Sequence, residues 1–325
     1  YSALEGKIMR IFPVPNDINN KWISYPEITE YNYEGADSLY VNNVLNLYFQ
    51  TLRVAVQDQD YTQSEELLES IKGFQKKYGS QVMPSDFKIN SEVVYNKVDI
   101  FNRLYKWYLF AGLGLLLILI FQIFYNNKFS SHLIKIFESL IITLFVFNTI
   151  GLAARWYIAG HAPWSDAYES IIFVAWATVI FGIIFGRKSY FTLASSTFVA
   201  SIILSIAHMN WLDPSIANLQ PVLDSYWLMI HVAVIVGSYG PFAIGMILGI
   251  VTLILTIIAT KKNRKIFSRK LEELTIVNEL SLTIGLVMLT IGNFLGGMWA
   301  NESWGRYWGW DPKETWALIS IMIYT

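Results

Sequence analysis

Apolar runs of roughly 20 residues or more follow one another from about Trp107 to the end of the chain, and no other feature restricts the fold as strongly. The hydrocarbon core of a bilayer is about 30 Å thick, which a helix of this length crosses. The runs are separated by shorter polar segments that carry the Gly, Pro and charged residues typical of helix ends. The sequence therefore predicts an all-α, polytopic integral membrane protein.

Six complete membrane helices are expected, and the start of a seventh is expected near Pro312. The fifth helix is long for one crossing, and Pro241 within it predicts a kink. The six helices are expected at residues 107–125, 136–158, 167–186, 191–209, 228–260 and 279–299.

Residues 1–103 predict a soluble, mostly helical domain that precedes the membrane domain at 104–325. It opens with IFPVPNDINN, a loop-like sequence, and helical patterns follow at about 37–58 and 61–78. This domain carries no catalytic motif, so we expect it to act in docking or scaffolding. The chain begins at Tyr1 and stops at Thr325 inside an apolar run, as expected for part of a longer polypeptide.

The composition excludes several kinds of chemistry. The chain has no cysteine, so disulfides, thiolate metal sites and cysteine nucleophiles are excluded from the protein itself. The formal net charge is -1, and a polytopic membrane chain of this charge is not expected to bind nucleic acid.

Basic residues cluster after the first, third and fifth expected helices. Since cytoplasmic segments are enriched in Lys and Arg, these three segments are expected in the cytoplasm. The N-terminal domain and the other segments then face outward, to the periplasm at a bacterial inner membrane. The cytoplasmic cations are Lys128, Lys135, Arg187, Lys188, Lys261, Lys262, Arg264, Lys265, Arg269 and Lys270, and the main outer ones are Arg155, Arg306 and Lys313.

The outer segments are rich in tryptophan and histidine. RWYIAGHAPWSDAYES follows the second helix, and HMNWLDPSIANLQPVLDSYWLMIHV follows the fourth. These segments place His161, His208 and His231 on the outer side and leave His132 on the cytoplasmic side. A single interfacial histidine usually has a structural role, but His231 begins a membrane helix from which an imidazole can reach a shared outer surface.

The segment WGRYWGWDPKETW, residues 304–316, follows the sixth helix and carries four tryptophans. Interfacial tryptophans anchor helix ends, but one or two are enough, so Trp304, Trp308 and Trp310 in one short loop predict a ligand surface. Aromatic rings and imidazoles suit a flat porphyrin whose iron takes nitrogen ligands, which indicates haem. Arg306 is the cation best placed for a propionate.

Asp311 has a structural explanation of its own. Asp311, Pro312 and Glu314 form a helix-start signature, with an acid at the N-cap, proline at the first helical position and Glu at the third. We therefore expect the Asp311 carboxylate to accept hydrogen bonds from backbone N–H groups of the next helix, with ligand contact secondary.

The sequence WGRYWGWD at 304–311 matches W-G-x-x-W-x-W-D, the tryptophan-rich "WWD" signature of haem-handling proteins of cytochrome c maturation. The continuation PKETWALI, and the segments GHAPWSDAYES and DSYWLMIHV, resemble the CcsA branch, the system II cytochrome c synthases. The resemblance covers about residues 104–325. The preceding soluble domain suggests the C-terminal part of a fused CcsB and CcsA polypeptide.

The resemblance implies a holocytochrome c synthase (haem lyase) that is active as part of the longer polypeptide, with its CcsB-like part. Such a protein exports haem b and presents it in reduced form at the outer surface, where the CxxCH motif of an apocytochrome c gains thioether bonds. His231 matches one axial ligand, and the second is expected beyond Thr325. The haem-binding residues that the resemblance implies are His231, Trp304, Gly305, Arg306, Trp308, Trp310 and Asp311.

Two other functions fit the same residues. A haem transporter or chaperone would pass haem to a separate ligase, and a polytopic small-molecule transporter would use the tryptophans only as an interfacial belt.

Overall fold

A computed structural model describes residues 9–31, 33–124, 128–187, 189–209, 211–216, 225–259 and 264–325. Contacts between residues divide the chain into two compact units, Tyr1–Ile89 and Asn90–Thr325. Within the described residues the regular structure is almost entirely helical, which confirms the expected all-α class.

The first unit is built on two long helices joined by a short turn. Phe74 of one helix stacks on Tyr40 of the other with ring centroids 5.2 Å apart, and Phe12 meets Phe74 edge-on at 6.3 Å. These two helices confirm the helical segments expected at 37–58 and 61–78. The elements of this unit are β1 (Arg10–Pro13), β2 (Trp22–Ser24), the 3₁₀ helix η1 (Tyr25–Glu30), α2 (Gly35–Asp58) and α3 (Thr62–Gly79).

The loop expected at IFPVPNDINN is in part a β-hairpin. Strands β1 and β2 pair antiparallel, and they bury Phe12 and Ile23 against the helices. The turn between them holds Asn16 and Asn20 at positive φ, a conformation that Asn tolerates better than most residues. Pro and Asn mark the turn in the sequence, but tertiary packing of two single apolar side chains decides the strands.

The second unit contains the six expected membrane helices. Six helices are long and apolar enough to cross a membrane in the described part of the chain, which confirms a multi-pass membrane protein. Helix α4 (Asp86–Val98) begins in the first unit and ends in the second. The other helices of the second unit are α5 (Ile100–Phe124), α6 (Lys128–Ala159), α7 (Ala167–Gly186), α8 (Tyr190–His208), α9 (Tyr226–Ile258), α10 (Arg264–Trp304) and α11 (Pro312–Tyr324).

Helix α10 differs most from its expected bounds. It begins at Arg264 instead of Glu279, so Arg269 and Lys270 lie on a helix and not in a loop. Leu274 and Val277 are buried in the core and continue the apolar face of the helix, which explains why the helix extends through this charged sequence. The expected loop residues Lys188, Lys261 and Lys262 lie outside the described residues.

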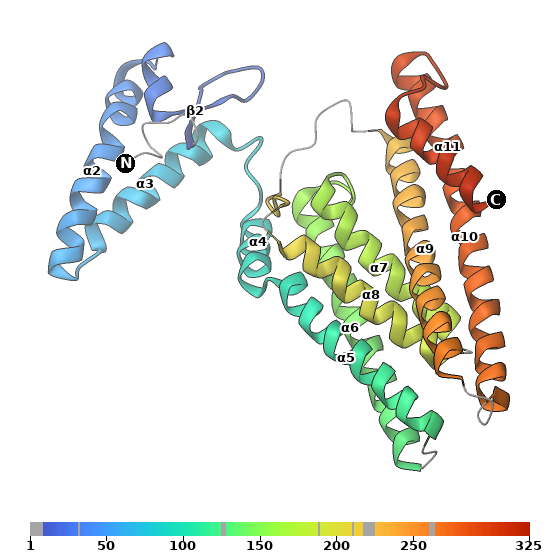
Figure 1. Cartoon of the computed structure of the whole chain (residues 1–325). Helices are drawn as coiled ribbons and strands as arrows, with labels where there is room; N and C mark the ends of the chain where they lie inside the picture. Colours follow the sequence, from blue (N-terminus) through green and yellow to red (C-terminus); the bar gives the residue numbers. More distant parts are fainter. Residues whose placement is uncertain are drawn as a thin grey trace. The chain divides into compact units, whose positions relative to one another are not determined.

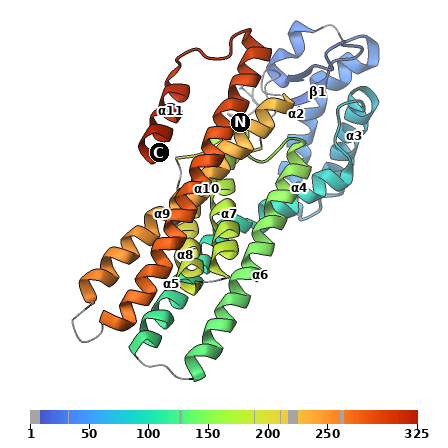
Figure 2. The same cartoon turned by 90° about the vertical axis from the view of Figure 1, so that its right-hand side faces the viewer.

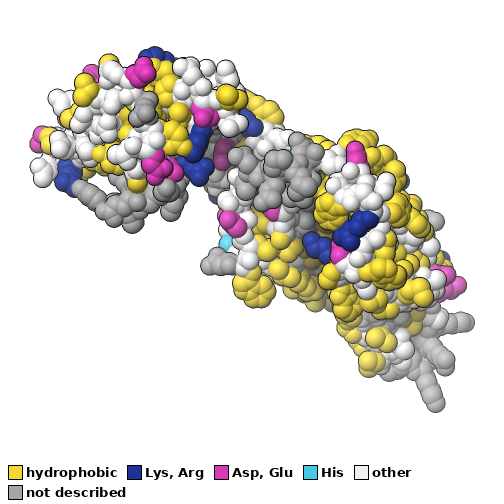
Figure 3. Space-filling model, turned by 90° about the horizontal axis from the view of Figure 1, so that it is seen from above, with side chains coloured by type: hydrophobic (Ala, Val, Ile, Leu, Met, Phe, Trp, Pro, Cys, Tyr) yellow, Lys and Arg dark blue, Asp and Glu magenta, His cyan; other side chains and the backbone are white. Residues whose placement is uncertain are grey.

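Helix α8 is the best buried of the membrane helices. It packs between α5 and α7, and 67% of its most apolar window is buried (Figure 1). Helices α9 and α10 form a long antiparallel pair, and α11 returns beside α10 (Figures 1 and 2). Apolar side chains cover much of the second unit's surface visible in Figure 3, as expected for a surface that faces lipid.

A buried ion pair holds the ends of several helices together. Arg155 of α6 and Glu169 of α7 are each only 1% exposed, and Arg155 Nε donates to Glu169 Oε1 at 2.8 Å. The other guanidinium nitrogens of Arg155 donate to the backbone carbonyls of Pro214 and Ser215, at 2.9 and 3.2 Å. Ser165 N donates to the second Glu169 oxygen at 2.9 Å. The pair therefore fixes the segment 211–216 and the loop between α6 and α7.

Replacing Glu169 by Ala should destabilise the protein strongly, because it leaves the Arg155 guanidinium buried without its main counter-charge. We expect a loss of about 3–5 kcal/mol, the range for breaking one side of a buried pair. Thermal unfolding of the purified protein in detergent measures it, with Glu272→Gln on the exposed surface of α10 as the control. Equal unfolding temperatures for the two variants would contradict the prediction.

Candidate haem site

Glycines on α10 allow α9 to approach it closely. A Cβ added at Gly292 would lie 2.5 Å from Ile235 Cγ1, and one added at Gly285 would lie 3.0 Å from Phe242 Cε1. Real Cβ atoms essentially never make a contact as short as the one at Gly292, and the one at Gly285 would be tight. Ile235 lies one helical turn after His231, so the same close approach brings His231 against α10.

His231 is part-buried on α9, and its ring packs on Gly296 of α10. Its Nδ1 lies 2.7 Å from the carbonyl oxygen of Gly292. A carbonyl oxygen can only accept, so Nδ1 carries the hydrogen and donates it. In the neutral ring, Nε2 then keeps its lone pair, which is the form of histidine that binds a metal.

The tryptophan loop begins where α10 ends. Gly305 adopts φ +68°, the left-handed conformation that ends many helices, and its N–H donates to Asn301 O at 3.0 Å. Trp310 also has a positive φ, +56°, which is uncommon for a bulky residue. These two reversals carry the chain from the end of α10 to the start of α11.

Tyr307 attaches the loop to α10. Its ring lies over Gly297, where an added Cβ would be 2.5 Å from Tyr307 Cε1, and its hydroxyl donates to Phe294 O at 2.9 Å. Sequence reasoning assigned no role to Tyr307. The only signal for this contact was the Gly296-Gly297 pair in a helix, which indicates that something packs closely there.

The loop exposes much of its aromatic surface. Trp304 is 50% exposed and Trp310 is 70% exposed, whereas Trp308 is partly buried against Trp310, with ring centroids 5.7 Å apart. The Arg306 guanidinium carbon lies 5.7 Å from the centre of the Trp304 ring. Trp299, which sequence reasoning missed, meets Trp304 edge-on at 4.9 Å. Single aromatic residues at a membrane surface need no ligand, but this group presents several ring faces and edges together.

Two indole nitrogens beside this loop lack partners. Among the described residues, Nε1 of Trp299 and Nε1 of Trp308 are buried and make no hydrogen bond. A buried N–H without an acceptor costs about 1–3 kcal/mol, so such groups are candidates for hydrogen bonds to a ligand.

The start of α11 confirms the structural explanation of Asp311. Its Oδ1 accepts from Lys313 N at 2.7 Å and from Glu314 N at 2.9 Å. Glu314 Oε2 reaches back to Gly309 N at 2.8 Å and to Asp311 N at 3.4 Å, which completes the capping box. Both carboxylates are therefore committed to the backbone of the loop and helix.

The loop between α6 and α7 supports the start of α9. Trp164 Nε1 donates to Met229 O at 3.1 Å, two residues before His231. His161 lies near the same buried ion pair, with Nδ1 4.0 Å from Glu169 Oε2 and 3.3 Å from Ala162 O. His161 and Trp164 therefore have structural contacts within the protein.

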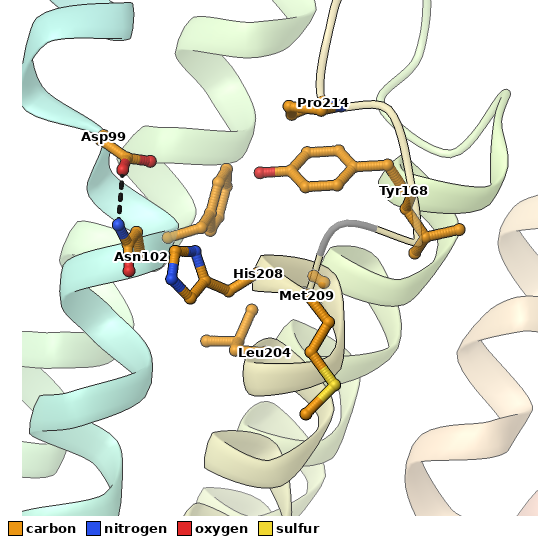
Figure 4. Close-up of a pocket in the computed structure, with 10 residues that line it drawn as sticks. Asp99, Asn102, Tyr168, Leu204, His208, Met209 and Pro214 are labelled. Atoms are coloured by element: carbon orange, nitrogen blue, oxygen red, sulfur yellow. Dashed lines mark hydrogen bonds between the residues drawn. The ribbon is translucent and has the colours of Figure 1, made fainter.

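His208 lies in a different place, where the start of α5 meets the end of α8. It faces a cavity of about 180 Å³ together with Asn102 and Tyr168 (Figure 4). Its ring stacks on Tyr105 with ring centroids 5.5 Å apart. Asn102 donates to Asp99 at 2.7 Å, drawn as the dashed line. The cavity is smaller than the roughly 300–1,000 Å³ of sites for drug-sized ligands.

The residues predicted for haem binding thus fall into two groups that α10 connects. His231 contacts one glycine of α10, and the tryptophan loop is tied to the next glycine through Tyr307. Within the described residues no group of three or more His, Cys, Asp and Glu side chains could hold a metal ion.

Comparison with known proteins identifies the family. The family model described as "Cytochrome C assembly protein" matches residues 164–325. "Cytochrome c biogenesis protein CcsA" of Prochlorococcus marinus (strain MIT 9301) is 32% identical over 264 residues, 71% of this chain and 81% of that protein. The chain belongs to the CcsA-type cytochrome c assembly family.

Other relatives of this CcsA-type chain differ in length. "Protein NrfI" of Wolinella succinogenes is 39% identical over 323 residues, which are 99% of this chain and 35% of NrfI. The CcsA protein of Solanum lycopersicum is 30% identical over 238 residues, 59% of this chain and 73% of that protein. The chain therefore spans about a third of NrfI and most of the CcsA proteins.

Replacing Asp311 by Ala should loosen the first turn of α11, because two backbone N–H groups lose their acceptor. The expected cost is about 0.5–2 kcal/mol, and hydrogen exchange at the Lys313 and Glu314 amides measures it as faster exchange. Asp311→Asn keeps an acceptor oxygen and should keep most of the protection. Unchanged exchange in the Ala variant would show that the cap does not stabilise the helix.

Proposed function

We propose that this chain is the haem-presenting part of a system II cytochrome c haem lyase. The observation that carries the proposal is His231, whose Nδ1–H is bound to the Gly292 carbonyl so that Nε2 can ligate iron beside the tryptophan loop. Membership in the CcsA-type family supports the assignment to cytochrome c biogenesis.

The chemistry of the loop fits haem as the substrate. Trp304 and Trp310 offer exposed aromatic faces, and the unpartnered Trp308 N–H can donate to an oxygen of the bound molecule. Arg306 and Gly305 would line the same surface, with the Arg306 guanidinium available to a propionate carboxylate. Asp311 would act through the position of the loop, since its carboxylate already binds the backbone of α11.

The attachment step needs no nucleophile from this chain. Each thiol of an apocytochrome CxxCH motif adds across a vinyl group: a C–S bond forms, and the thiol hydrogen goes to the other vinyl carbon. This addition is neither a net oxidation nor a net reduction. Both sulfurs come from the apocytochrome, which is compatible with a chain that has no cysteine. The protein's contribution is to hold and orient the haem, which is catalysis by proximity.

The proposal includes a location and partners. The basic residues at the ends of α6, α7 and α10 favour a cytoplasmic side, which leaves His231 and the tryptophan loop on the periplasmic side of a bacterial inner membrane. A second axial histidine is expected beyond Thr325. A CcsB-like part of the same or another chain would complete the route by which haem arrives, and residues 1–103 would be an extracytoplasmic domain.

Replacing His231 by Ala should abolish covalent holocytochrome formation and change the absorption spectrum of the co-purified haem. Co-expression with one apocytochrome c, in a host that lacks its own maturation system, measures formation of the thioether-bound product. Added imidazole should restore part of the spectrum by supplying the missing nitrogen. Unchanged activity and spectrum would eliminate His231 as a ligand.

The same co-expression separates a lyase from a haem transporter or chaperone. A lyase produces covalent holocytochrome with no further maturation protein, whereas a chaperone gives haem-bound protein without thioether product. Purification with no haem absorbance would favour a membrane protein whose tryptophans form only an interfacial belt.

A further inference from the structure

We propose that Gly296 and Gly297 of α10 are positioning residues that set where His231 lies relative to the tryptophan loop. The proposal rests on the proposed function, because it takes His231 as the ligand of haem iron. The two glycines lie outside the tryptophan-rich motif at 304–311, and the proposal gives them a role of their own.

Gly296 determines the position of the His231 ring. A Cβ at this position would lie 2.7 Å from Nδ1 and 3.0 Å from Nε2, with Cε1 closer still, and Cβ atoms essentially never show contacts under 3.0 Å. Any side chain at 296 therefore forces the imidazole away from α10. The ring would then lose the 2.7 Å hydrogen bond from Nδ1 to Gly292 O.

Gly297 determines the position of the loop in the same way. A Cβ there would lie 2.5 Å from Tyr307 Cε1 and 2.6 Å from Cζ, so the Tyr307 ring can pack on the helix here only because residue 297 has no side chain. The Tyr307 hydroxyl donates to Phe294 O, one turn earlier on α10. The positions of His231 and of the tryptophan loop are thus set by consecutive residues of one helix, α10.

The hydrogen bond to Gly292 matters for the chemistry as well as the position. It fixes the tautomer with hydrogen on Nδ1. It also orients the ring, so that Nε2 is the nitrogen that does not face Gly292 O. Partners of this kind typically change metal affinity by about 10- to 100-fold when they are lost. A backbone carbonyl cannot be removed by substitution, but Gly296→Ala breaks the contact by moving the ring.

The test compares Gly296→Ala with Gly249→Ala in the intact protein, each purified with its co-purified haem. At Gly249 the nearest atom to an added Cβ is Asn278 Nδ2 at 4.0 Å, so this control adds a methyl group to the same helix pair without a clash. We expect Gly296→Ala to retain about 10- to 100-fold less haem and to lose the six-coordinate, low-spin spectrum. Added imidazole should restore that spectrum, and Gly249→Ala should match the unsubstituted protein.

Tyr307→Phe provides a second variant if Gly296→Ala does not fold. It keeps the ring on Gly297 and removes only the hydroxyl that donates to Phe294 O. We expect haem to dissociate about two- to tenfold faster from this variant, as fits the loss of one hydrogen bond. Haem dissociation at the unsubstituted rate would overturn the role of the Tyr307 hydroxyl in positioning the loop.

The outcomes separate this inference from the proposed function. If the unsubstituted protein binds no haem, or His231→Ala keeps the original spectrum, the proposed function fails and this inference fails with it. If His231→Ala loses the spectrum while Gly296→Ala keeps it, the positioning role is overturned and the haem site stands. Loss of the spectrum in both, with imidazole rescue of both, supports the proposal.

Discussion

The close packing of α9 on α10 is the constraint on which the candidate site depends. Ile235 on α9 lies against Gly292, and His231, one turn away, lies against Gly296. At this separation a backbone carbonyl of one helix can accept a hydrogen bond from a side chain of the other, and the bond from His231 to Gly292 O is that contact. A bulkier α10 surface would separate the helices and leave the imidazole without a fixed orientation.

The loop between α6 and α7 and the segment 211–216 depend on a second interaction, the buried pair of Arg155 and Glu169. Removing two charges from water is costly, and here the cost is offset by hydrogen bonds that also hold the backbone of Pro214 and Ser215. Trp164, in the same loop, donates to Met229 at the start of α9. Segments far apart in the sequence therefore converge on the helix that carries His231.

Several separate interactions position the parts of the candidate site. The helix pair sets the histidine, the capping box of Asp311 and Glu314 sets the end of the tryptophan loop, and Tyr307 joins the loop to α10. The aromatic faces of Trp304 and Trp310 are left open. Membership in the CcsA-type family is consistent with the proposed haem site.

The sequence by itself determined the membrane class, the number of spans and the cap at Asp311, because these follow from local periodicity and helix-end chemistry. It also indicated the family, through the tryptophan-rich motif at 304–311 and the segments GHAPWSDAYES and DSYWLMIHV. It could not determine the hairpin at Arg10–Pro13, the helical start of α10 at Arg264 or the partners of Arg155, since each depends on residues that meet only in the folded chain. The tertiary structure alone decided that Nδ1 of His231 binds Gly292 O and that Tyr307 covers Gly297, because which glycine faces which ring is set by the packing register of two helices and not by either helix alone.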